Sequence, residues 1–121
     1  FLLCKAFGLD EAVTMSMLPK SVTTPIAMSL SEELGGITSV TVAVVIATGI
    51  MGSILAPTLI KVFHVKSPIA AGVAIGTCSH AIGTSRAMQL GEIEGAMSGI
   101  AIGVSGLLTM ILALLYHSMM M

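Results

Sequence analysis

Two short polar stretches interrupt an otherwise apolar chain, and their residue types suit the binding of a small anion. The first covers residues 19–25 (PKSVTTP) and the second covers residues 79–86 (SHAIGTSR). Each combines hydroxyl groups with a cationic side chain, Lys20 or Arg86. A helix that restarts after such a break presents free N–H groups and partial positive charge to an anion. We therefore expect a shared binding site, with the candidate residues Lys20, Ser21, Thr23, Thr24, Ser79, His80, Thr84, Ser85 and Arg86.

Several of these side chains also have a simpler structural interpretation. Thr24 and Ser85 suit helix N-caps and could do no more than that. Lys20 could snorkel to a membrane interface, and Arg86 could pair with a nearby glutamate. His80 is compatible with three roles: a hydrogen-bonded packing residue, a ligand contact and a proton carrier. Ionisable groups inside a membrane are nevertheless functional candidates, and arginine can hold a carboxylate with two parallel hydrogen bonds.

Other kinds of chemistry find little support in the sequence. It offers no nucleophile beside a base and no metal-ligand spacing, so we expect no enzyme, metal or cofactor. Cys4 and Cys78 stand alone and far apart, which argues against a disulfide framework. The formal net charge of −1 provides no basic surface for a nucleic acid.

The composition predicts an integral membrane protein of the all-α class. Of 121 residues, 55% are hydrophobic and 9% are charged, with a mean hydropathy of +1.05, whereas soluble domains carry about 25% charged residues. Residues 36–60 and 95–116 lack charged side chains, and about 20 apolar residues of helix cross the hydrocarbon core. We therefore expect full transmembrane helices over 37–62 and 95–116. In the second, glycines recur every four residues, at positions 95, 99 and 103, and offer a smooth face for helix packing.

Two further apolar segments are each divided by one of the polar stretches. We expect interrupted helices over 12–30 and 68–90, each made of two halves of roughly ten residues. Such a half spans about 15 Å, so it reaches only to the middle of a membrane. Irregular backbone at that depth is tolerated only where protein or water satisfies its polar groups.

The sequence also matches itself when it is shifted so that Thr24 aligns with Thr84. This match at a constant offset predicts an internal repeat. The predicted units cover residues 9–63 and 64–121, and residues 1–8 would end a preceding segment of a longer polypeptide. Re-entrant hairpins would give two units inverted in the membrane, and broken spanning helices would give parallel units. We favour the inverted arrangement, in which a transporter site commonly lies between the repeats. The matched pairs are Thr24/Thr84, Ala27/Ala87, Met28/Met88, Leu30/Leu90, Glu32/Glu92 and Gly35/Gly95, and Lys20 falls on His80.

Residues 18–27 (LPKSVTTPIA) and 79–87 (SHAIGTSRA) closely resemble the LrgB/CidB family, and the likeness extends over nearly the whole chain. The resemblance implies the C-terminal half of a longer protein with further N-terminal spans. Bacterial members are described as antiholin-like or holin-like and are linked to control of murein hydrolase activity and lysis. A plant relative is a plastidal glycolate/glycerate translocator, and some bacterial members are implicated in pyruvate handling.

Two main functional hypotheses follow for a multi-pass protein of the cell membrane. The first is a carrier for small monocarboxylates such as glycolate, lactate or pyruvate, with a site formed by the two polar breaks. The alternative is an antiholin-like or holin-like regulator of murein hydrolase activity and lysis, and a purely structural subunit is a third possibility. The expected partners are a small organic anion, the lipid bilayer, further copies of the chain and the N-terminal half that the resemblance implies.

Overall fold

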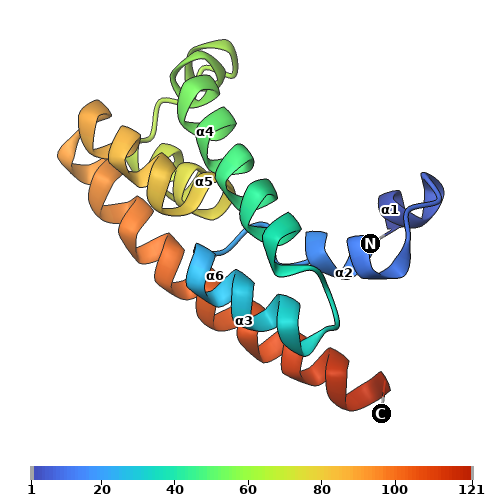
Figure 1. Cartoon of the computed structure of the whole chain (residues 1–121). Helices are drawn as coiled ribbons and strands as arrows, with labels where there is room; N and C mark the ends of the chain where they lie inside the picture. Colours follow the sequence, from blue (N-terminus) through green and yellow to red (C-terminus); the bar gives the residue numbers. More distant parts are fainter. Residues whose placement is uncertain (1, 121) are drawn as a thin grey trace.

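The structure is a computed structural model that describes residues 2–120, without the side chains of His117 and Met120. Residues 1 and 121, at the outer ends of the predicted segment 1–8 and unit 64–121, lie outside the described residues. All regular elements of the described part are helices (Figure 1). They are α1 (Leu2–Ala6), α2 (Glu11–Met17), α3 (Thr24–Glu33), α4 (Thr38–Val62), α5 (Pro68–Leu90) and α6 (Glu92–Met120).

Two of the helices are long and apolar enough to cross a membrane: α4, and residues Glu92–Tyr116 of α6. At 25 and 29 residues, α4 and α6 extend for about 37 and 43 Å, more than the roughly 30 Å of a hydrocarbon core. Helix α4 agrees closely with the predicted span 37–62. Helix α6 is longer at both ends than the predicted span 95–116, and Glu92 and Glu94 occupy its first turn, where acidic side chains favour a helix N-terminus.

The first predicted interruption is present as a gap between α2 and α3. Helix α2 ends at Met17 and α3 begins at Thr24, with Pro25 in its first turn. Thr23 has extended backbone angles (φ −64°, ψ 148°), the usual conformation of the residue that precedes a helix as its N-cap. The missing proline N–H costs a helix nothing at its first turn, where that group has no partner anyway.

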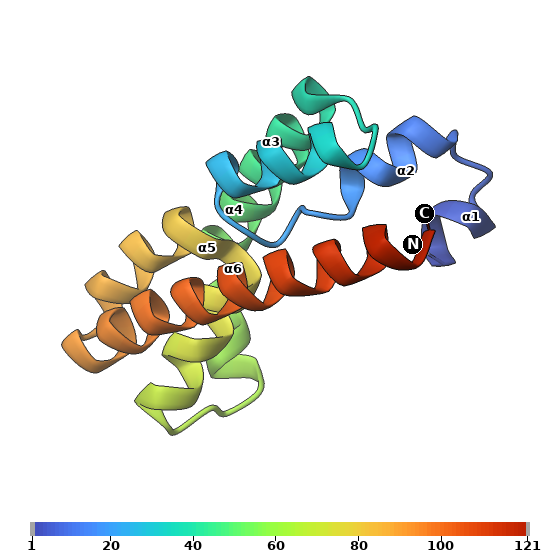
Figure 2. The same ribbon diagram turned by 90° about the horizontal axis from the view of Figure 1, so that it is seen from below.

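The second interruption lies at His80, where α5 folds back on itself. His80 has φ 38° and ψ −134°, far from helical values, while the residues on both sides are helical. Gly72 packs against Glu94 and Gly76 against Ser98. After His80 the order reverses, because Thr84 contacts Ser98 and Met88 packs on Gly95. The two halves of α5 therefore lie side by side against the start of α6 and form a hairpin (Figures 1 and 2).

Buried hydroxyl groups join α2, α3 and α4. The Thr41 hydroxyl contacts the Ser16 carbonyl oxygen at 2.9 Å and the Ser31 hydroxyl at 2.7 Å. The Ser16 hydroxyl accepts a hydrogen bond from the backbone N–H of Ile37 at 2.6 Å. All three hydroxyl residues are fully buried. The pairing satisfies polar groups in an apolar interior, and it brings the end of α2, the end of α3 and the start of α4 to one point.

One contact in each half of the chain joins positions that are related by the offset of the predicted repeat. Ser16 meets Thr41, and at the equivalent positions Gly76 lies so close to Ala101 that an added Cβ would stand 3.0 Å from the alanine Cβ. The long helices α4 and α6 run in broadly opposite directions (Figures 1 and 2), with the end of α4 near the start of α6 across a cavity that Lys61 and Glu94 share. Helix α4 follows the gap between α2 and α3, and α6 follows the interrupted helix α5.

Candidate functional site

The two interruptions meet in space, and the meeting point is formed by Lys20 and His80. The backbone and the charge of Lys20 lie near enough to the His80 imidazole to influence it electrostatically. These are the two residues that the sequence repeat places on one another. Their proximity joins the gap between α2 and α3 to the tip of the α5 hairpin.

His80 is the most enclosed ionisable residue of this junction. Its side chain is 3% exposed, and its Nε2 atom is buried without a hydrogen-bond partner. A buried polar atom that lacks a partner costs about 1–3 kcal/mol. Such atoms are therefore rare, and each one in a folded protein calls for an explanation.

A short chain of hydroxyl groups holds the backbone of His80 in place. The Thr84 hydroxyl donates to the His80 carbonyl oxygen at 2.9 Å and also contacts the Ser98 hydroxyl at 2.7 Å. Because Thr84 gives its only proton to the carbonyl, Ser98 must be the donor in the second contact. Ser98 is fully buried on α6. The Thr84 hydroxyl therefore helps to hold the backbone at the break.

The first break exposes the cation Lys20 and is held in place by the buried side chain of Val22. Lys20 is exposed, and its Nζ donates to the Ser21 hydroxyl at 3.1 Å. Val22, next along the chain, is buried in a cluster with Ala27 and Val45. The buried valine ties the irregular segment to α3 and α4, so the position of the neighbouring lysine and serine backbone is fixed.

Three other predicted residues lie close to these breaks. Thr23 precedes α3 as its N-cap without a side-chain capping bond, and Thr24 is the first residue of the helix; both are partly buried. Ser79 is 2% exposed and packs so tightly against Gly52 of α4 that an added Cβ on the glycine would overlap its hydroxyl. The contact between Ser79 and Gly52 fixes the tip of the α5 hairpin against α4.

The remaining two predicted residues make local hydrogen bonds within α5. The Ser85 hydroxyl donates to the Ala81 carbonyl oxygen at 3.4 Å, and Arg86 Nη1 donates to Gln89 Oε1 at 2.6 Å. Both bonds are exposed. The described hydrogen bond of Arg86 is therefore with an amide one turn further along the same helix.

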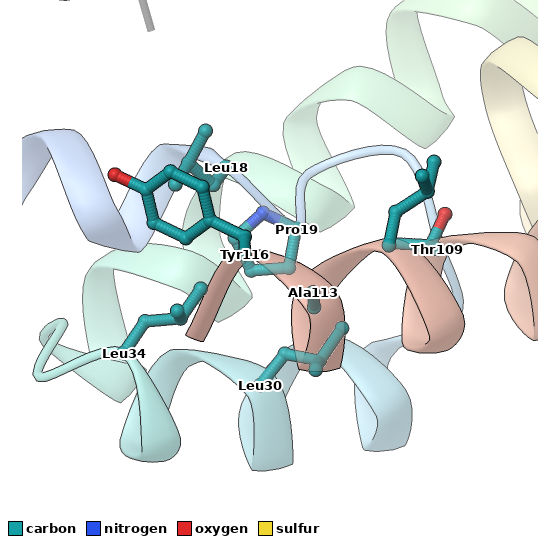
Figure 3. A pocket seen from close by; sticks show the side chains of 8 residues that line it. Leu18, Pro19, Leu30, Leu34, Thr109, Ala113 and Tyr116 are labelled. Carbon is teal, nitrogen blue, oxygen red and sulfur yellow. The ribbon is translucent and has the colours of Figure 1, made fainter. Parts of the chain in front are cut away.

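Two cavities of about 400 Å³ flank the breaks, and both are lined by apolar side chains. One lies between α3 and the C-terminal part of α6 and is drawn in Figure 3, where Leu30, Leu34, Pro19 and Tyr116 surround it. The other lies between α4 and the first half of α5 and reaches Ser79. Neither is lined by Lys20 or His80, so these hollows suit hydrocarbon rather than an anion.

Sequence reasoning identified both breaks but missed their supports. Ser98 on α6 and Gly52 on α4 lie inside apolar runs, and the neighbouring sequence does not indicate which residues they contact. The buried trio Ser16, Ser31 and Thr41 was missed for the same reason. The available signal was their polarity within long apolar helices, because a buried hydroxyl in such a helix requires a partner.

The fold and the junction define a helical protein with two candidate membrane spans and two interrupted helices whose breaks meet. A sequence profile described as the LrgB-like family matches residues 1–119, and the chain belongs to this family. The resemblance of the two polar motifs to the LrgB/CidB family is thereby confirmed.

Named relatives agree with this assignment. The antiholin-like proteins LrgB of Bacillus cereus (strain B4264) and Bacillus anthracis (strain A0248) are each 44% identical to the chain over 111 residues. The matches cover 92% of this chain and 48% of each relative, so the chain spans about half the length of these curated relatives. No solved structure shows significant similarity to it.

Proposed function

We propose that this chain is part of an antiholin-like regulator of murein hydrolase activity and lysis, in a multi-pass protein of the cell membrane. The proposal rests on the family and on the names of relatives that are 44% identical over 92% of the chain. These names favour the lysis hypothesis, which the sequence alone placed second to a carrier. The activity belongs to the whole protein, of which this chain corresponds to about half.

The structural observation behind this proposal is an open glycine face on α6. Gly95 is covered by Met88, but an added Cβ on Gly99 or Gly103 would meet nothing within 4 Å. Small residues four apart let two helix backbones approach closely in a membrane. We propose that this face binds a helix of a second copy, of the N-terminal half or of a partner through which lysis is controlled.

The test compares glycine-face variants of the full-length protein in a bacterial strain that lacks its own family member. Culture turbidity follows lysis, and zymography of cell extracts measures murein hydrolase activity. The wild-type protein should delay lysis and lower hydrolase activity. The double substitution Gly99→Leu and Gly103→Leu should abolish most of this effect, because leucine keeps the helices apart.

Val104→Leu provides the matched control. It adds bulk to the same helix at a side chain that is already 52% exposed, so lysis should proceed as with the wild type. Membrane levels of all variants are measured by immunoblot. A double glycine variant that is present at normal level and restrains lysis fully would contradict the proposed binding face.

A second candidate function, a carrier for small monocarboxylates, is favoured by the junction of Lys20 and His80. We infer two inverted repeats, because α4 and α6 run oppositely and equivalent contacts recur at the offset of the sequence repeat. In transporters built from inverted repeats, discontinuous helices commonly surround a substrate site between the repeats. The lysine ammonium, the Ser21 hydroxyl and the start of α3 would receive the carboxylate.

Uptake of labelled lactate or glycolate into vesicles that contain the full-length protein tests the carrier. Saturable uptake that is strongly reduced by Lys20→Met, with Lys61→Met as the control at an exposed site outside the junction, would support it. Arg86→Ala tests the remaining predicted cation. Dye leakage that does not saturate and ignores the substrate would contradict a carrier and support a lesion-forming role.

A further inference from the structure

We propose that an anionic phospholipid binds at the α4–α5 corner, where α4 ends and α5 begins (Figure 1). The ammonium groups of Lys61 and Lys66 hold the phosphate of the headgroup. The apolar cavity between α4 and the first half of α5 encloses one acyl chain. This lipid site depends on neither the lysis function nor the carrier function proposed above.

The way in which α4 ends brings the two lysines to one cavity. The N–H of His64 donates to the Lys61 carbonyl oxygen at 3.2 Å. The next N–H, that of Val65, donates to the Ile60 carbonyl oxygen at 3.0 Å. Together with the positive φ of His64 (51°), this is the Schellman arrangement, which directs the chain back over the last helical turn. As a result, Lys61 and Lys66 line the same cavity of about 180 Å³.

This small cavity has an excess of positive charge. Both lysines are exposed, and no ion pair or hydrogen bond of their side chains occurs in the described part of the chain. Glu94 also lines the cavity, but its carboxylate lies against Gly91 at the start of α6, where a helix N-terminus favours negative charge. The two ammonium groups therefore remain available for an anion, and phosphate oxygens accept strong hydrogen bonds from such groups.

A larger apolar cavity continues from the corner along the two helices. Its volume is about 420 Å³, and it shares Ile60, Val65 and Ala71 with the charged cavity. Its far end is lined by Gly52 on α4 and by Ser79 near the tip of the α5 hairpin. The other residues that line it are hydrophobic. A charged cavity that leads into an apolar one matches a phospholipid, whose anionic headgroup is joined to hydrocarbon.

The depth of the apolar cavity matches one leaflet of a membrane. At 1.5 Å per residue, about 14 Å of helix separates Gly52 from Lys61, and about 17 Å separates Pro68 from Ser79. Half of a hydrocarbon core is about 15 Å thick. The cavity therefore begins at the level of the lysines and ends near the middle of the membrane, which is the reach of an acyl chain from its headgroup.

The size of the apolar cavity and the sign of its charge favour a lipid over a helix from another segment. A helix about 10 Å in diameter fills roughly 1,200 Å³ over a length of 15 Å, about three times the volume of this cavity. Lysines that follow a transmembrane helix closely favour the cytoplasmic side. The leaflet on that side carries anionic lipids, and basic pockets between membrane helices there bind their headgroups.

The test measures lipid binding to the full-length protein in a neutral detergent by native mass spectrometry. Phosphatidylglycerol and phosphatidylcholine with the same acyl chains are titrated separately. The wild type should bind phosphatidylglycerol about thirtyfold more tightly, the factor expected from two lysines at a membrane surface. Lys61→Gln combined with Lys66→Gln should abolish this preference and keep the weaker binding of phosphatidylcholine.

Two further double variants show whether the position of the charge matters. Lys61→Arg with Lys66→Arg keeps both positive charges at the corner and should retain the preference for phosphatidylglycerol. Lys5→Gln with Lys20→Gln removes two positive charges from other parts of the chain and should retain it as well.

A separate substitution tests the acyl chain. Ala74 lines the apolar cavity and is exposed, so the ring of Ala74→Phe would fill the space and weaken binding of both lipids about tenfold. Ala96→Phe is the matched control, because Ala96 is exposed on α6 and lines neither cavity. Glycerophosphoglycerol, the headgroup without its chains, should not displace the bound lipid at equal concentration.

Any of five results would overturn the inference. The wild type could bind both lipids equally, as expected if another protein segment covered the corner. The preference could persist in Lys61→Gln with Lys66→Gln, or be lost equally in Lys5→Gln with Lys20→Gln, which would attribute it to overall charge. Ala74→Phe could bind both lipids as Ala96→Phe does. Displacement by glycerophosphoglycerol would indicate a site for free phosphate esters. None of these results bears on lysis or on uptake of carboxylates.

Discussion

The positive φ of His80 leads to a stability prediction with an unusual sign. We compare His80→Gly with His80→Ala. Both variants remove the imidazole and its contacts, so those losses cancel in the comparison. What differs is the Cβ atom at a residue with φ 38° and ψ −134°.

The magnitude follows from two opposing terms. Alanine keeps the strain of a Cβ in this region, which costs about 1–3 kcal/mol. Glycine removes the strain, but the greater freedom of its unfolded chain costs roughly 0.5–1 kcal/mol. The glycine variant should therefore be more stable than the alanine variant by about 1 kcal/mol. In an ordinary helix the order is reversed, with glycine about 1 kcal/mol less stable than alanine.

The assay is unfolding of the full-length protein in mixed micelles, with increasing denaturing detergent and circular dichroism as the readout. Ala96→Gly provides the reference, because Ala96 is an exposed residue within α6 and its replacement should lower the free energy of unfolding. If His80→Ala proved as stable as His80→Gly, or more stable, the backbone at His80 would not be strained as described and the turn at the tip of α5 would be wrong.

Three further predictions concern the supports of the junction and the path of the chain. Thr84→Val should lower the free energy of unfolding by about 1–2 kcal/mol, because the hydroxyl bridge to the His80 carbonyl is lost; Thr84→Ser should restore most of it in the same micelle assay. Gly52→Ala should cost about 1–3 kcal/mol by overlap with Ser79, and the cost should be smaller in a Ser79→Gly background, so a double-mutant cycle measures it. With both native cysteines replaced by serine, Lys66→Cys and Glu92→Cys should react with an impermeant thiol reagent from the same side of the membrane, because the α5 hairpin returns to the side on which it begins; labelling from opposite sides would mean that α5 crosses.

The sequence provided a local cause for the first interruption but not for the second. Around Lys20, prolines at positions 19 and 25 gave the break a local cause, and the structure has it between Met17 and Thr24. Around His80 the break was expected from polarity alone. The most natural residue for a left-handed turn there is Gly83, but this glycine remains helical and packs against the side chains of Ile75 and Ser79. The close packing of the hairpin, not the intrinsic preference of any residue, selects His80 as the turn.

For the candidate site, too, the sequence predicted some features and left others open. Polarity in an apolar chain was enough to nominate the two motifs, because buried polar groups need partners wherever they lie. It could not tell which hydroxyls were already engaged. Thr84 gives its proton to the His80 carbonyl, Ser85 bonds within its own helix, and Arg86 bonds to Gln89. Those partners depend on rotamers and on a second helix, neither of which spacing along the chain defines.

By itself, the sequence determined that this protein has long apolar helices and two interrupted ones, because the length of apolar runs and the positions of proline and charge act locally. Its motifs also determined the family. Only the tertiary structure decided that α5 is a hairpin, that Lys20 lies near His80 although the two are far apart along the chain, and that Nε2 of His80 is buried without a partner. These features follow from which helix faces pack together, and such packing is a property of the whole fold.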